Sequence, residues 1–234
     1  MQFKHLGILL QIIPYSDHSV VLKVFTRGEG LQSFMYRKSR KQKTTGILQP
    51  LSLLEIESFK KPATDLHTVK ELKPHYRFQT IGSSYSKNTV ILFLNELLLQ
   101  ALREPGYVIE ELFDFIQRWL MDFDEEERAG EKHLFFLAEL CVQMGIQPLN
   151  NFSAAHSCFD VAAARFIHSP MGNQLTFNKE DSLLFHSLLF GKEKTPLSRE
   201  QKKQMAECFI TYFQVHLPGV KEIKSLPVLK EILD

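Results

Sequence analysis

The first 80 residues alternate apolar and polar side chains with a period of two, which is typical of β-strands that have one side in a core. Glycine, proline and aspartate interrupt this alternation at short intervals, as they do in turns between neighbouring strands. The pattern predicts five strands, over residues 6–13, 20–25, 31–37, 48–59 and 66–78, with a bulge at Leu53 and Leu54 where the apolar phase slips. Five strands in so short a segment predict a small β-barrel or sandwich.

After Ser83 the apolar positions recur with the period of an α-helix. Helices are predicted over residues 90–102, 108–119, 131–144, 179–190 and 198–216, and a short last helix follows Pro227. Residues 149–178 follow neither period, so we expect them to be irregular. The sequence therefore predicts an α+β protein with a β domain over residues 1–80 and an all-α domain over residues 81–234 that carries an irregular insert.

The composition is that of a globular protein, because 44% of the 234 residues are hydrophobic and 24% are charged. Three cysteines without a CxxC pair indicate a reducing compartment, so we expect a cytoplasmic protein. The N-terminus lacks the pattern of a signal peptide, and no apolar run reaches the roughly 20 residues that a membrane-spanning helix needs. We therefore expect no membrane partner.

The net charge of +1 is a cancellation between two oppositely charged parts of the chain. Residues 1–80 hold 13 Lys and Arg against 6 Asp and Glu, a net charge of +7. Residues 81–234 hold the remaining 15 Lys and Arg against 21 Asp and Glu, a net charge of −6. The basic β domain is therefore the part that we expect to bind an anionic partner such as nucleic acid.

A basic run begins at the end of the third predicted strand, where five of seven residues are cationic and none is acidic: Arg37, Lys38, Arg40, Lys41 and Lys43. Phe34 and Tyr36 precede the run on the strand, and we expect Lys23 and Arg27 to extend it. Cations that displace counterions from phosphates, together with rings that stack on bases, are what single-strand binding needs. These nine residues are the candidate DNA-binding site, and a solvated connection between strands is the alternative.

Two further charged groups lie in the helical part. The acidic run Asp122, Asp124, Glu125, Glu126 and Glu127 is expected to be a solvated turn at a helix end. Arg199, Lys202 and Lys203 share one helical face at spacings of three and four residues. They are a candidate surface for an acidic peptide or for a second strand of nucleic acid, and a solvated face is the alternative.

No catalytic or metal-binding motif is present in the sequence. It lacks the glycine-rich phosphate loops, the nucleophile elbow and the zinc-hydrolase pattern H-E-x-x-H. His156 and Cys158 form one H-x-C pair without a second pair, which is too little for a zinc site. We therefore expect neither an enzyme nor a bound cofactor or metal.

Several segments match one known family in order and spacing. They are Gly7-Ile8-Leu9-Leu10, Ile13-Pro14-Tyr15-Ser16-Asp17, Phe25-Thr26-Arg27-Gly28-Glu29-Gly30, Arg37-Lys38-Ser39-Arg40, Leu48-Gln49-Pro50-Leu51-Ser52-Leu53-Leu54-Glu55, His216-Leu217-Pro218 and Lys224-Ser225-Leu226-Pro227-Val228-Leu229. Together they resemble the family of the bacterial DNA repair protein RecO. The ordered set, rather than any single motif, carries the resemblance, which spans nearly the whole chain.

The resemblance implies an N-terminal five-stranded OB-fold barrel, a helical domain and a non-enzymatic mediator of recombination associated with the bacterial nucleoid. Such proteins bind single- and double-stranded DNA, anneal complementary strands and bind the acidic C-terminal tail of single-strand-binding protein. With RecR, and often RecF, they help load RecA. Many members carry a four-cysteine zinc module after the third helix. This chain has Asn150-Asn151-Phe152 and a lone Cys158 there, so we expect a degenerate segment without zinc.

A function of a different class stays open at this point. The basic β domain would then bind an acidic protein surface, and the protein would be an interaction adaptor whose contact with DNA is incidental.

Overall fold

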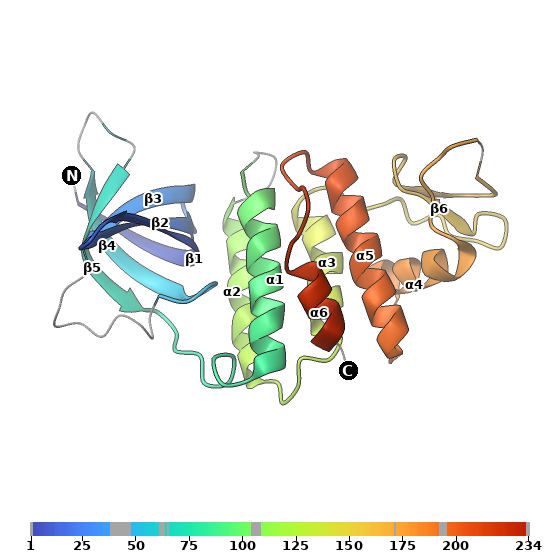
Figure 1. The fold of residues 1–234 in the computed structure, drawn as a ribbon. Coiled ribbons are helices and arrows are strands. Elements are labelled where there is room, and N and C mark those ends of the chain that lie inside the picture. Colours follow the sequence, from blue (N-terminus) through green and yellow to red (C-terminus); the bar gives the residue numbers. More distant parts are fainter. Residues whose placement is uncertain are drawn as a thin grey trace. The chain divides into compact units, whose positions relative to one another are not determined.

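The computed structural model describes residues 2–37, 48–60, 64, 66–103, 109–170, 172–191 and 196–232 (Figure 1). The first elements are β1 (Gln2–Ser16), β2 (Ser19–Thr26), β3 (Gly30–Arg37), β4 (Leu53–Lys60), β5 (Leu66–Pro74), α1 (Tyr85–Ala101), α2 (Ile109–Glu125) and α3 (Lys132–Gln143). They are followed by β6 (Cys158–Asp160), β7 (Arg165–Ile167), α4 (Lys179–Phe190), α5 (Arg199–His216) and α6 (Leu226–Ile232). Contacts divide the chain into two compact units, Met1–Glu127 and Arg128–Asp234.

Strands β1 to β5 form a closed barrel in the order β1-β2-β3-β5-β4, which confirms the five-stranded barrel expected at the N-terminus. Alternate residues of the strands fill its core: Leu9, Val20, Leu22, Val24, Phe34, Tyr36, Leu54, Ile56 and Leu72. Successive side chains of a strand point to opposite sides, so the residues between these core positions face outward.

The fourth strand differs from its prediction. Strand β4 begins at Leu53, because the chain before it turns through Leu51, whose φ is 60°. The pairing of β4 with β1 runs without a shift along the strand, so the bulge predicted at Leu53 and Leu54 was wrong. The register shift lies between Glu57 and Ser58, against β5. Both leucines are fully buried, which explains why the apolar phase slips in the sequence.

Strand β1 is shared by two sheets of the barrel. Its residues 2–8 pair with β4 and its residues 7–16 pair with β2, so both neighbours contact it at Gly7. A Cβ atom at Gly7 would lie 2.3 Å from Cγ1 of Val24, far inside van der Waals contact. Glycine is therefore the residue that fits where β1 passes from one sheet to the other.

Helices α1 and α2 belong to the same compact unit as the barrel. The ring of Phe25 on β2 lies 5.9 Å from that of Phe113 on α2, measured between centroids. Asn95 of α1 donates a hydrogen bond from Nδ2 to the carbonyl oxygen of Leu10 at 3.0 Å. The barrel is thus packed against both helices. Within the described ranges, no helix is both long enough and apolar enough to span a membrane.

Asp124, at the end of α2, is 1% exposed, which corrects the prediction of a solvated acidic run for this one residue. Asp122, Glu125 and Glu127 of the same run are exposed, as predicted. Its carboxylate accepts hydrogen bonds from the consecutive backbone amides of Gln79, Thr80 and Ile81 at 2.7, 2.9 and 3.0 Å. Lys87 of α1 donates from Nζ to the hydroxyl of Thr80 at 2.6 Å and to the carbonyl oxygen of Asp124 at 3.0 Å. These bonds tie the segment that leaves the barrel to both helices.

In the second compact unit, a short antiparallel hairpin of β6 and β7 stands within the segment that was predicted to be irregular. The ring of Phe159 lies 5.0, 5.5 and 4.9 Å from those of Phe166, Phe177 and Phe185, measured between centroids. Asn151 bonds both the amide and the carbonyl group of Phe166, each at 2.9 Å. The aromatic cluster and the two hydrogen bonds of the Asn151 side chain, which are like those of a paired strand, therefore order this segment.

We predict that Gly7→Ala destabilises the barrel, because the added methyl group overlaps Val24. Overpacking of this kind costs about 1–3 kcal/mol of the free energy of unfolding. Urea unfolding followed by circular dichroism measures the loss. The matched control is Gly28→Ala, where a Cβ atom would meet nothing within 4 Å, and equal stability of the two variants would contradict the assignment.

Asp124→Asn is predicted to lower the free energy of unfolding of the first compact unit by about 1–3 kcal/mol near neutral pH. The reason is that the carboxylate that accepts hydrogen bonds from three backbone N–H groups is replaced by a neutral amide. Burial alone would raise the pKa of the Asp124 carboxyl, but the backbone hydrogen bonds outweigh burial and lower it below 3.8. A lowered pKa gives stability that is present above about pH 4 and is lost as the pH falls further. Unfolding free energies of both proteins should therefore converge in acid, and a gap that does not depend on pH would contradict this account.

Candidate nucleic-acid interface

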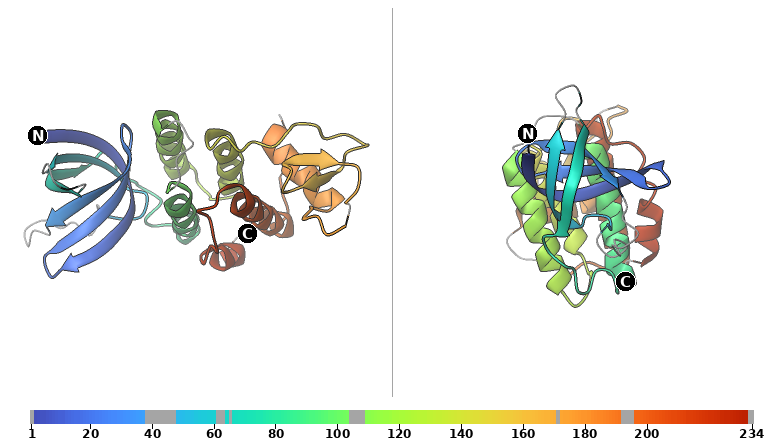
Figure 2. Two further views of the ribbon diagram at one scale, coloured as in Figure 1. Left: turned by 90° about the horizontal axis from the view of Figure 1, so that it is seen from above. Right: turned by 90° about the vertical axis from the view of Figure 1, so that its left-hand side faces the viewer.

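The second half of β1, together with β2 and β3, forms one outer surface of the barrel. Cross-strand pairing sets its rows, because Lys23 lies between Gln11 and Ser33, and Val21 lies between Ile13 and Met35. The outward residues, which we call the β1–β2–β3 face, are Gln11, Ile13, Ser19, Val21, Lys23, Ser33, Met35 and Arg37. Figure 2 shows the three blue strands side by side in the barrel wall. No carboxylate is among these residues, so the face suits an anionic ligand.

Two of the predicted cations lie on this face. Lys23 donates from Nζ to the hydroxyl of Ser33 at 2.7 Å, so its ammonium group lies over the neighbouring strand. Arg37 is exposed at the end of β3, beside Ser19 of β2. The rest of the basic run, Lys38, Arg40, Lys41 and Lys43, lies outside the described residues, but the chain enters it directly from Arg37.

Arg27 was expected to extend the basic track, and the structure gives it another role. Its guanidinium makes a bidentate pair with the carboxylate of Asp114 on α2, at 2.7 and 2.8 Å, and Glu110 lies 3.7 Å away. The hydrogen bond and charge of Asp114 raise the pKa of Arg27, and the same pair lowers the pKa of Asp114. Arg27 therefore holds the barrel against α2, and its charge is already balanced.

Phe34 and Tyr36 are buried in the barrel, with exposed fractions of 0% and 6%, so their rings cannot stack on bases. The reason is the alternation along β3: Ser33, Met35 and Arg37 face outward, and the two aromatic residues lie between them. This corrects the predicted stacking role. The sequence already implied this, because neighbouring side chains of a strand point to opposite sides and an outward Arg37 requires an inward Tyr36.

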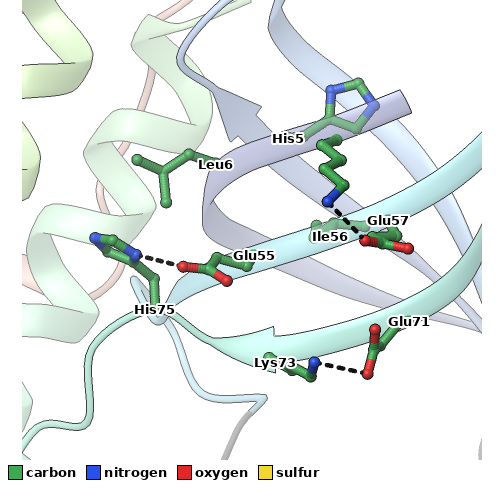
Figure 3. A pocket seen from close by; sticks show the side chains of 9 residues that line it. His5, Leu6, Glu55, Ile56, Glu57, Glu71, Lys73 and His75 are labelled. Carbon is green, nitrogen blue, oxygen red and sulfur yellow. Dashed lines mark hydrogen bonds and ion pairs between the residues drawn. The ribbon is translucent and has the colours of Figure 1, made fainter. Parts of the chain in front are cut away.

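The other outer surface, formed by β1, β4 and β5, carries charges of both signs around a pocket of about 310 Å³ (Figure 3). Lys4 pairs with Glu57 at 3.2 Å, Lys73 pairs with Glu71 at 2.8 Å, and His75 contacts Glu55 at 2.9 Å. The hydrogen bond from Lys4, together with its positive charge, lowers the pKa of the Glu57 carboxyl. Lys70 also lies 3.8 Å from Glu57, so the three glutamates of this surface are balanced by three lysines. Lysines that are already paired attract phosphate less than unpaired ones, so the two outer surfaces of the barrel differ in the ligand that they suit.

Comparison with known proteins matches two family models to the chain, one to the barrel segment and one to the segment that follows it. The model of the family described as "Recombination protein O N terminal" matches residues 1–78, and that of "Recombination protein O C terminal" matches residues 82–227. The chain belongs to the RecO family. Its members include the DNA repair protein RecO of Phocaeicola vulgatus, which is 30% identical over 98% of each chain. The RecO protein of Flavobacterium psychrophilum is 29% identical over 99% of each chain. That of Porphyromonas gingivalis is 29% identical over 97% of this chain and 98% of its own length. The protein therefore has the DNA repair and recombination role of the RecO family.

The zinc module of many RecO-family members does not fit the residues of this chain. A site of four thiolates cannot be built where Cys158 is the one cysteine in the corresponding segment, and its side chain is buried beside the aromatic cluster. Within the described residues, no three His, Cys, Asp or Glu side chains come close enough to share a metal ion.

The three cations suggested for partner binding in the RecO-family helical domain do not form one exposed surface. Lys202 is 8% exposed and lies 3.8 Å from the carboxylate of Glu131. Arg199 donates to the carbonyl oxygen of Glu231 at 2.9 Å, and Lys203 is half-buried. Lys202 is therefore a structural residue, which corrects the expectation that all three bind a partner.

Proposed function

We propose that this protein is a non-enzymatic recombination mediator that binds single- and double-stranded DNA and anneals complementary strands. With RecR, it helps load RecA onto DNA coated by single-strand-binding protein. The observation that carries the proposal is the difference between the two outer surfaces of the barrel. The β1–β2–β3 face presents Lys23 and Arg37 without a carboxylate, while on the surface of β1, β4 and β5 the lysines are paired with Glu57 and Glu71.

DNA is held mainly through its phosphates in this proposal. Lys23 and Arg37 bind the backbone on the β1–β2–β3 face, and the basic run that continues from Arg37 adds further contacts. Contacts of this kind release condensed counterions and carry no sequence information. The protein would therefore bind any DNA sequence at the nucleoid, as a mediator of repair requires, and no covalent bond would be made or broken.

The helical part supplies the protein contacts. Its net charge of −6 repels phosphate, so DNA is directed to the barrel segment, and an acidic tail would need a local group of cations on the helical part. We infer that RecR, the acidic tail of single-strand-binding protein and, where present, RecF are recognised outside the β1–β2–β3 face. This arrangement leaves the face open to DNA while partners are bound.

The salt dependence of DNA binding tests the proposal. Six phosphate contacts, one from Lys23 and five from the basic run, give a slope of about −4.2 for log K against log salt on single strands, and each lost contact flattens it by about 0.7. Lys23→Ala is therefore expected to flatten the slope by about 0.7, and replacement of Arg37, Lys38, Arg40, Lys41 and Lys43 by alanine removes most of the remainder. Fluorescence anisotropy with a labelled oligothymidine measures both.

Lys4→Ala and Lys73→Ala are the matched controls, because these lysines lie in the same barrel but on the surface with carboxylates. They should leave the slope unchanged. A slope that responds equally to Lys23→Ala and Lys4→Ala would mean that DNA does not select the β1–β2–β3 face.

Annealing separates the mediator from the adaptor, the alternative in which the barrel binds an acidic protein surface. We expect the protein to speed the annealing of complementary oligonucleotides, both bare and coated with single-strand-binding protein. Stopped-flow fluorescence with a donor and an acceptor dye on the two strands gives the rate. Unchanged rates, together with retained binding to single-strand-binding protein, would support the adaptor instead.

A further inference from the structure

The hairpin between β1 and β2 carries an exposed aromatic ring that the sequence reasoning did not single out. Tyr15 is 69% exposed, and every residue from 11 to 18 is exposed. A register shift between Pro14 and Ser16 leaves Tyr15 without a cross-strand partner, so its ring is not packed against a neighbour across the hairpin. A phenol ring with so much of its surface in water is available to a ligand.

Register places this ring next to the predicted phosphate contacts. Ser16 pairs with Ser19, and Ser19 pairs in turn with Arg37, so the tip of the hairpin lies beside the end of β3. Ile13, 36% exposed, continues from the hairpin into the apolar row of the β1–β2–β3 face. The exposed ring, an apolar row and a cation therefore meet at one end of this face.

Other rings of the barrel are poorly placed for this task. Phe34 and Tyr36 are buried, and among the described barrel residues the large aromatic side chains more than a third exposed are Tyr15 and Phe59. Phe59 lies on β4, where it pairs with β1 and β5, in the other sheet. A base held near Arg37 therefore has Tyr15 as its neighbouring ring.

We propose that Tyr15 stacks on a base of single-stranded DNA whose phosphate is held by Arg37. The inference rests on the proposed function and names the contact by which the protein would distinguish single-stranded from duplex DNA, since bases in a duplex are already stacked on one another. Asp17 lies in the same turn and repels phosphate, so the backbone passes on the Arg37 side of the hairpin. The ring adds affinity without reading sequence, because every base has a face on which it can stack.

Tyr15→Ala tests the inference when affinities for oligothymidine and for an abasic strand with the same number of phosphates are compared. The wild-type protein should prefer oligothymidine, and the variant should lose that preference, with about 5- to 100-fold weaker binding to oligothymidine. Affinity for the abasic strand, affinity for duplex and the salt slope should stay unchanged, because no charge is removed. Retained duplex binding shows that the variant is folded.

Two further variants sharpen the result. Tyr15→Phe keeps the ring and should keep the affinity, while Tyr85→Ala removes a 73% exposed ring from α1 and should change nothing. Tyr15→Trp should show quenched fluorescence when oligothymidine binds. Equal binding of oligothymidine by Tyr15→Ala and the wild type would overturn the stacking role alone, whereas a wild-type protein that binds no DNA would overturn the proposed function as well.

Discussion

Closure of the barrel by β1 is the constraint on which the rest of the structure depends. The strand pairs with β4 along its first half and with β2 along its second half, and the two pairings meet at Gly7. Once the barrel is closed, every strand residue faces either the core or the outside, and alternation decides which. Lys23 and Arg37 face outward for that reason, and Phe34 and Tyr36 face inward. The ligand surface is therefore set by the same pairing that sets the core.

Charged residues of the first compact unit have two separate tasks. Arg27 with Asp114, and Asp124 with the amides that follow the barrel, are used to pack the barrel against α1 and α2. Because Arg27 is neutralised by its partner, it adds little to the field that a phosphate would experience. On the β1–β2–β3 face, Lys23 and Arg37 have no neighbouring carboxylate among the outward residues. Counting charges along the sequence does not separate these tasks, whereas pairing in space does.

Much of the fold could be predicted from periodicity. The predicted helices over residues 179–190 and 198–216 agree with α4 and α5 to within one residue at each end, because caps and an apolar stripe mark them. The hairpin of β6 and β7 was missed because its strands have three residues each, too few to display a period. The burial of Asp124 was missed because it depends on amides more than 40 positions earlier in the chain.

Less of the candidate site could be predicted. The basic run was visible in the composition, but the side of β3 on which each residue lies depends on register, and Tyr15 becomes a candidate only when the end of β3 is placed beside the hairpin. The central claim is that DNA binds the β1–β2–β3 face. Acetylation of lysines with and without oligothymidine, read by mass spectrometry, tests it most directly. The account predicts that DNA protects Lys23 and leaves Lys4 and Lys73 reactive; protection of Lys4 and Lys73 with Lys23 still reactive would contradict it.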